Sequence, residues 1–200
     1  MTIFVISALF IILLYPFLSN LRLSEIAVAL TYGPILFCGT NYVMCGQIDI
    51  HTLLLSLPTM FFTVNLVFTD NILDKDSDKR QGKRTIIGLF KSNKRIERFH
   101  RLILISAYFS LFLIIYLNIV HSISLLVFIT VPLSIDLLKS MEEYLKNSKS
   151  IPERKYFHFP MENYVQLQNN GMLAYMFRMY QARNIMIYSA VIFAITLYFL

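Results

Sequence analysis

The residues best suited to chemistry in this sequence are carboxylates that follow directly on an apolar stretch. Asp70, Asp74 and Asp78 are spaced four residues apart, with Asn71 beside the first of them. On a continuing helix this spacing lines their oxygens along one face, whereas Asp76 points the other way. Because like charges four residues apart on a helix repel each other, the row favours a cation that bridges it.

Magnesium is the divalent cation that such a row suits. It binds one or two carboxylates, keeps several waters and takes its remaining ligands from substrate phosphates. Lys79, Arg80, Lys83 and Arg84 come next, and Gly82 lets the chain turn between them. These cations are placed to contact the outer oxygens of a diphosphate. The spacing alone leaves an alternative open, namely a solvated charged loop that only fixes membrane topology.

The composition is that of a membrane protein, with 56% hydrophobic and 15% charged residues and a mean hydropathy of +0.60. Uncharged stretches long enough to cross a bilayer can satisfy their backbone hydrogen bonds only as helices. We therefore expect an all-α fold, a polytopic integral membrane bundle of about six transmembrane helices. The expected spans are 2–18, 26–45, 51–70, 102–120, 122–138 and 184–200.

The basic residues predict the orientation of these spans. With six spans, all 18 Lys and Arg residues fall on one side of the membrane, which the positive-inside rule assigns to the cytoplasm. We expect a multi-pass protein of the cell membrane, in contact with lipid, whose Asp-rich loop is cytoplasmic. No basic stretch is interleaved with base-stacking aromatics, so the net charge of +6 does not indicate nucleic-acid binding.

The polar segments divide this single transmembrane domain, residues 1–200. Residues 71–98 form the Asp-rich and basic loop, and residues 140–183 form a cytoplasmic linker followed by an amphipathic helix. The helix, expected over 161–183, has apolar residues at helical spacing with arginines among them, which is typical of a helix lying in the membrane interface. Asp136, near the cytoplasmic end of the fifth span, either meets a basic group of the Asp-rich and basic loop or sits at the headgroup level.

The segment from Asp70 to Thr85, which ends in Gly-Lys-Arg-Thr, resembles the second aspartate-rich motif of the UbiA superfamily of intramembrane prenyltransferases. The likeness is closest to the MenA branch, the 1,4-dihydroxy-2-naphthoate polyprenyltransferases. There the motif reads Asn-Asn, two residues, Asp, three residues, Asp, then Ala-Gly-Lys-Arg-Thr. Asp70 replaces the first Asn, while Asn71, Asp74 and Asp78 match. The segments 21–43 and 177–184 resemble two further stretches of these enzymes.

The resemblance implies an enzyme that moves a polyprenyl group from an allylic polyprenyl diphosphate to an aromatic quinone precursor with Mg²⁺, as in menaquinone biosynthesis. It implies roles for seven residues. Asp74, Asp78 and Asn71 are the expected magnesium ligands, and Asp70 and Lys79 assist in holding the metal and the diphosphate. Lys83 and Arg84 are expected, with the two ligand aspartates, to stabilise the leaving diphosphate.

Only the later part of the family's nine-helix fold is matched. The family's other aspartate-rich motif, which faces the second one across a central cavity, has no counterpart in this sequence. Three interpretations stay open: a fragment, a split gene product that needs a chain supplying the missing N-terminal helices, or a degenerate remnant. The last is a non-catalytic membrane subunit, and it is the alternative to an enzyme.

Overall fold

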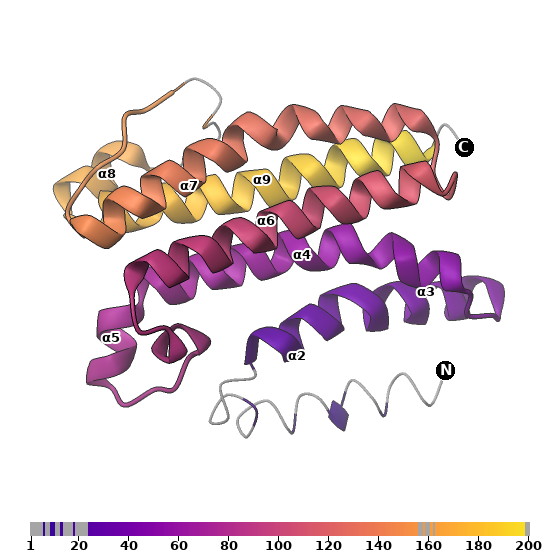
Figure 1. Cartoon of the computed structure of the whole chain (residues 1–200), viewed down its shortest axis with the longest axis horizontal. Coiled ribbons are helices and arrows are strands. Elements are labelled where there is room, and N and C mark those ends of the chain that lie inside the picture. Colours follow the sequence, from indigo (N-terminus) through magenta and orange to yellow (C-terminus); the bar gives the residue numbers. More distant parts are fainter. Residues whose placement is uncertain are drawn as a thin grey trace.

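The computed structural model describes residues 24–155, 158, 161 and 163–198, with isolated positions among the first 18 residues. Most of the first expected span, 2–18, lies outside the described residues. The described part contains helices and their connections and no strand, so the expected all-α fold is confirmed. Figure 1 shows the long helices lying side by side as a bundle.

Five long rods make up the described bundle. The first is bent and consists of α2 (Ser24–Leu30), η1 (Thr31–Ile35) and α3 (Leu36–Cys45). The second, α4 (Ile50–Leu73), is followed by short α5 (Lys75–Arg80) and η2 (Ile86–Leu89), and then by α6 (Asn93–Tyr116). A 3₁₀ segment, η3 (Ser122–Thr130), continues into α7 (Val131–Lys146). Short α8 (Tyr164–Asn169) precedes the last rod, α9 (Leu173–Tyr198).

Local sequence signals set the ends and bends of these rods. The side chain of Asp49 caps α4 by accepting a hydrogen bond from the Thr52 amide at 2.7 Å. Pro132 lies in the first turn of α7, where its missing N–H costs nothing. Within η1, Pro34 follows Gly33, and the rod kinks there because proline cannot complete the helical hydrogen-bond pattern.

Four of the described helices are long and apolar enough to cross a membrane: Glu25–Cys45, Ile50–Leu73, Asn93–Tyr116 and Ser122–Lys146. They correspond to four of the expected spans. α9 has 26 residues but is not among the four, and its first third carries arginine and amide side chains. The expected span 184–200 is therefore the second part of a longer, more polar-ended helix, and residues 199–200 lie outside the described part.

The helices extend further into the charged segments than the sequence predicted. α6 begins nine residues before the expected span, so its first turns carry part of the basic loop. α7 continues eight residues past the expected end at 138. The amphipathic helix expected over 161–183 is not a separate element, because residues 173–183 form the start of α9. Arg178, expected at the membrane surface, is fully buried in the protein.

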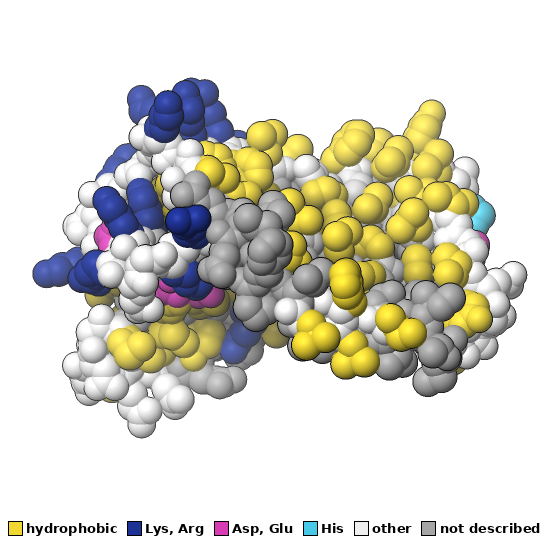
Figure 2. All heavy atoms as spheres, turned by 90° about the horizontal axis from the view of Figure 1, so that it is seen from below, with side chains coloured by type: hydrophobic (Ala, Val, Ile, Leu, Met, Phe, Trp, Pro, Cys, Tyr) yellow, Lys and Arg dark blue, Asp and Glu magenta, His cyan; other side chains and the backbone are white. Residues whose placement is uncertain are grey.

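Two apolar clusters lie along the interior of the bundle, with buried polar side chains between the helices, and the charges gather at one end. One core cluster includes Phe68, Ile72, Ile103 and Ile185, and a second, farther along the helices, includes Leu111 and Phe193. Figure 2 shows Lys and Arg side chains crowded at one end of the molecule and hydrophobic side chains over the rest of that face. We call the charged end, where α4 ends and α6 begins, the basic end.

Candidate active site

The aspartate row follows the end of α4 into α5 at the basic end. α4 stops at Leu73, and Asp74 (φ −86°, ψ 0°) joins it to α5. Helical hydrogen bonds nevertheless cross this break: the Asp74 amide donates to the Asp70 carbonyl at 2.9 Å, and the Asp78 amide donates to the Asp74 carbonyl at 2.8 Å. The three aspartates therefore keep almost the spacing of one continuous helix, although they are divided between α4 and α5.

Asp70 and Asp74 are partly buried beneath a tyrosine of α9. The Tyr175 hydroxyl donates a hydrogen bond to Asp70 Oδ1 at 2.6 Å. Burial and this hydrogen bond raise the pKa of Tyr175, so the hydroxyl keeps its proton. Burial, and then the negative charges of Asp70 and Asp78, raise the pKa of Asp74. The repulsion predicted from the spacing is therefore present, and a cation between these carboxylates would relieve it.

Asp78 is the most buried of the three aspartates, with its side chain 8% exposed. Its Oδ1 lies 3.3 Å from Lys83 Nζ, whereas its Oδ2 is buried without a hydrogen-bond partner. A buried carboxylate oxygen without a donor costs free energy, so such atoms mark places where a ligand completes the structure. Asp78 therefore presents one free oxygen for a metal ion or a donor.

Asp78 also lines a pocket of about 370 Å³ at the basic end. Its wall is made by α5, the turn after it and η2, and Gly82 has the positive φ of 70° that the turn needs. The residues around it are mostly cationic or small: Lys75, Lys79, Gly82, Lys83, Arg84, Thr85, Ile87, Gly88 and Phe90. Lys79, Lys83 and Arg84 are exposed, which leaves their charged groups available to an anion.

Asn71 faces a different neighbour from the aspartates. Its Nδ2 donates to Glu25 Oε1 of α2 at 2.7 Å, and both side chains are buried. The same carboxylate oxygen accepts the backbone N–H of Ile86 at 3.4 Å. Glu25 thus ties the end of α4 to the loop that carries Lys83 and Arg84. The structure places Asn71 against this anchor, so its amide nitrogen is already occupied.

Sequence reasoning missed Glu25 and Tyr175. Glu25 had a signal, because an acidic residue at the edge of an apolar span is costly unless it has a partner or a function. Tyr175 had none, since it is 105 residues from Asp70 along the chain and only tertiary packing of α9 against α4 brings the two together.

A second polar cluster joins α7, α9 and the connection between them. Asp136 pairs with Lys155 and with His158 Nε2, the latter at 2.7 Å, and Gln181 donates to the same carboxylate at 2.8 Å. Its basic partners Lys155 and His158 belong to the connection after α7 and not to the Asp-rich loop, so the contact expected with that loop is not found among the described residues. Burial lowers the pKa of His158 in spite of the neighbouring carboxylate. The cluster fixes the connection onto the helices.

Arg178 explains why the start of α9 is buried. Its guanidinium donates to the carbonyls of Ser140, Ser150 and Ala174 at 2.8, 2.9 and 2.7 Å. It also lies 4.9 Å from the centre of the Tyr144 ring. With these contacts a buried arginine is satisfied without any carboxylate partner. Arg178 therefore holds the connection after α7 rather than anchoring a surface helix.

The carboxylates do not form a metal cage by themselves. Within the described residues, no three acidic, histidine or cysteine side chains converge closely enough to hold a metal ion. Magnesium needs no such cage, because one or two carboxylates suffice when phosphates supply the other ligands. The free Oδ2 of Asp78 and the mutual repulsion at Asp74 fit that ion, so these two aspartates are candidates for holding it.

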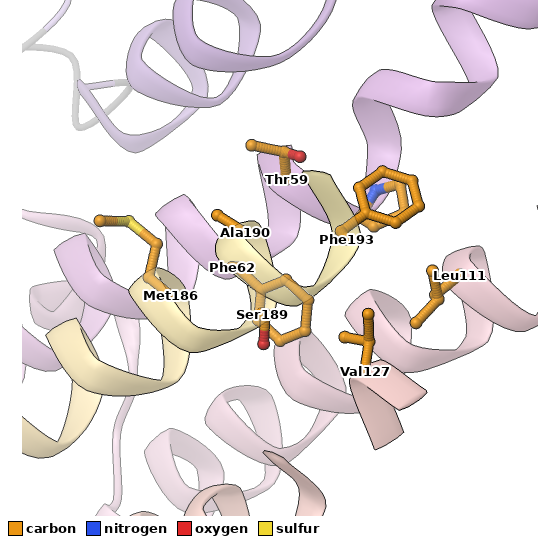
Figure 3. A pocket seen from close by; sticks show the side chains of 9 residues that line it. Thr59, Phe62, Leu111, Val127, Met186, Ser189, Ala190 and Phe193 are labelled. Carbon is orange, nitrogen blue, oxygen red and sulfur yellow. The ribbon is translucent and has the colours of Figure 1, made fainter. Parts of the chain in front are cut away.

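The deeper half of the bundle is closely packed. Figure 3 shows a cavity between α4, α6, η3 and α9, lined by Thr59, Phe62, Leu111, Val127, Met186, Ser189, Ala190 and Phe193. Its volume is about 20 Å³, enough for about one water molecule. This cavity is too small for a prenyl chain, so the residues lining it serve packing.

Residues 1–161 match the family model described as the UbiA prenyltransferase family. The chain belongs to this family. Membership supports a prenyltransferase-type function and agrees with the helical membrane bundle. No curated protein matches the chain, and neither does any solved structure.

Proposed function

We propose that this UbiA-family chain takes part in the magnesium-dependent transfer of a polyprenyl group from an allylic polyprenyl diphosphate to an aromatic quinone precursor. The observation that carries the proposal is the buried carboxylate of Asp78, which has one oxygen without a hydrogen-bond partner and belongs to a residue that lines a pocket surrounded by cations. An anion pocket with a carboxylate in it suits a metal–diphosphate complex better than a bare anion, because the metal separates the like charges.

Each residue of the site has a distinct task in this proposal. Asp74 and Asp78 would hold Mg²⁺, and the bound ion would supply charge neutralisation of the diphosphate, so that the carbon–oxygen bond breaks with the diphosphate as leaving group and the allylic carbon bonds to the aromatic acceptor. Asp70, oriented by Tyr175, keeps the negative charge of the row high. Lys79, Lys83 and Arg84 contact the outer phosphate oxygens and stabilise the leaving group. In this proposal the salt bridge between Lys83 and Asp78 breaks when Lys83 pairs with the diphosphate.

Asn71 serves the site through its contact with Glu25. Because Glu25 accepts both the Asn71 amide and the Ile86 N–H, it sets the distance between the aspartates and the basic turn. We propose that Asn71 contributes its amide oxygen or a bridging water to the metal while its nitrogen stays on Glu25. The acceptor in a MenA-like enzyme is a dihydroxynaphthoate, which gives a menaquinone precursor.

The family's other aspartate-rich motif is not in this sequence, and the cavity in Figure 3 does not hold a prenyl chain. We therefore propose that the chamber for the prenyl chain and the acceptor is completed by helices that carry that motif, on the same or a second chain. The alternative is a non-catalytic membrane subunit that kept the diphosphate pocket. Its supporting observation is the lack of a three-carboxylate cluster in the described residues.

The test is a transfer assay with labelled geranylgeranyl diphosphate and 1,4-dihydroxy-2-naphthoate, with the membrane-embedded chain alone and with the product of any adjacent reading frame. We expect transfer that needs magnesium and falls by at least about a hundredfold in Asp74→Asn and Asp78→Asn. Asp76→Asn is the matched control, because Asp76 is exposed and outside the row. Undiminished transfer in both site variants contradicts the assignment, and no transfer under any condition favours the non-catalytic subunit.

A further inference from the structure

An apolar groove runs along the outside of the bundle, between α6 and the rod made by η3 and α7. Its volume is about 440 Å³, within the range of small-ligand sites. Nearly all of its walls are aliphatic or aromatic, and the lining residues are Arg101, Leu104, Ile105, Tyr108, Phe109, Phe112, Phe128, Val131, Ser134, Ile135 and Leu138. The Tyr108 hydroxyl is hydrogen-bonded to Ser134 Oγ and Thr130 Oγ1, both at 2.8 Å. The polar groups at the floor of the groove therefore already have hydrogen-bond partners.

The groove faces the hydrocarbon of the membrane. Both of its walls belong to helices long and apolar enough to span a bilayer. Phe109, Phe112, Ile105 and Ile135 line it and are about half exposed, at 62%, 50%, 55% and 49%. Side chains of this kind are stable in contact with acyl chains and costly in contact with water. Something apolar therefore fills the groove in the membrane.

Arg101 lies at the mouth of the groove nearest the basic end. It is the last charged residue of α6, because no charge follows it up to Tyr116. It is exposed, and its guanidinium makes no hydrogen bond or ion pair with any described residue. The nearby acid Glu142 forms its salt bridge with Lys146, with 2.6 Å between Oε1 and Nζ. Glu97 and Glu142 line a small cavity together with Arg101, but neither forms an ion pair with it in the described structure, so its N–H donors are free where this depth of the helix meets the headgroup layer.

Lys94 and Arg98 share this side of α6 with Arg101, since they precede it by seven and three residues. The mouth is therefore cationic while the groove is apolar. That combination matches an amphiphile with one acyl chain in the groove and a phosphate at the guanidinium, which binds phosphate through two parallel N–H donors. Of these three cations only Arg101 lines the groove itself, and its one guanidinium suits a phosphodiester there, while Lys94 and Arg98 add attraction for an anionic headgroup.

We propose that the groove between α6 and α7 is a binding site for an anionic phospholipid, with its phosphate on Arg101 and one acyl chain along Phe109, Phe112 and Ile135. This site is separate from the Asp-rich segment, where Asp70 contacts α9 and Asn71 contacts α2. A polyprenyl diphosphate is the competing amphiphile. It carries more negative charge, and the groove has no free carboxylate to bring a magnesium ion to it.

The experiment measures lipid binding to the purified full chain in neutral detergent by native mass spectrometry. Dioleoyl phosphatidylglycerol is the probe, dioleoyl phosphatidylcholine tests the need for net charge, and glycerol phosphate tests the headgroup alone. Arg101→Gln removes the charge, and Ile135→Trp fills the groove from an exposed position. Arg95→Gln is the matched control, because Arg95 is equally exposed on the same helix but turned away from the groove.

We expect phosphatidylglycerol to bind at least about tenfold more tightly than phosphatidylcholine, and Arg101→Gln to remove most of that difference. Ile135→Trp should weaken both lipids, and Arg95→Gln should change neither by more than about twofold. Arg101→Gln changes an exposed side chain and leaves the fold intact. If Ile135→Trp does not fold, the lipid preference of Arg101→Gln alone therefore tests the proposal. Equal binding in Arg101→Gln, binding of glycerol phosphate at the same site, or displacement by geranylgeranyl diphosphate would each overturn the proposal.

Discussion

Gly33 controls how closely α2 and η1 approach α4, and its replacement by alanine has a calculable cost. A Cβ added at Gly33 would lie 2.8 Å from Met60 Cβ and 3.0 Å from Met60 Cγ. Met60 Cβ is fixed to the α4 backbone, so no rotation of the side chain relieves the first contact. Overpacking of this kind costs about 1–3 kcal/mol. Gly33 has non-helical dihedral angles (φ −104°, ψ −108°), so the gain in helix propensity from replacing glycine does not offset this cost.

We therefore expect Gly33→Ala to lower the free energy of unfolding by about 1–3 kcal/mol, as measured by thermal unfolding in detergent micelles. The same substitution should cost less in a Met60→Ala background, because the clashing side chain is then shortened. Gly88→Ala is the control, since its added Cβ meets nothing within 4 Å. Wild-type stability in Gly33→Ala, or a cost unchanged by Met60→Ala, would refute the close approach.

Two further predictions concern the charges at the basic end. Since Asp70 helps to raise the pKa of Asp74, the folded state is favoured when Asp74 is protonated, and this stability is lost as the pH rises through the raised pKa. Asp70→Asn should lower the pKa of Asp74, so magnesium affinity should begin to rise at a lower pH than in the wild type. The measurement is a Mg²⁺ titration at a series of pH values between about 4 and 8. If the affinity has the same pH dependence in both proteins, the two carboxylates do not interact. Arg178→Met should destabilise the protein by at least about 3 kcal/mol in a thermal melt, because three backbone carbonyls lose a charged donor. Arg183 is partly exposed on the same helix, so Arg183→Met should cost less than about 1 kcal/mol. Equal melting temperatures of the two variants would contradict the structural role of Arg178.

The sequence predicted the local features of the site well. The four-residue spacing of the aspartates survives because helical hydrogen bonds continue through Asp74, and Gly82 forms the expected turn. Asn65, a polar residue predicted inside a span, is fully buried, and its Oδ1 lies 2.8 Å from His100 Nε2 of the neighbouring helix. Each of these features depends on residues close in sequence or on the cost of exposing a polar group to lipid.

The remaining features depend on contacts between distant segments. Asn71 was grouped with the aspartates, but Glu25, 46 residues earlier, takes its amide nitrogen. The helix expected at the membrane surface is the start of α9, because buried carbonyls, rather than headgroups, satisfy Arg178. Hydrophobic periodicity shows which face of a helix is apolar and does not show whether lipid or protein covers it. The partners of a long polar side chain are equally hidden from local pattern.

The measurement that tests the central claim most directly is the affinity for geranylgeranyl diphosphate with and without Mg²⁺, compared between Asp78→Asn and Asp76→Asn. If Asp78 holds the metal beside the cationic pocket, magnesium should tighten binding to the wild type and to Asp76→Asn, and Asp78→Asn should lose at least about tenfold of that magnesium-dependent affinity. Equal magnesium-dependent affinity in the two variants would contradict the account, because the buried free oxygen of Asp78 would then have no part in binding the substrate.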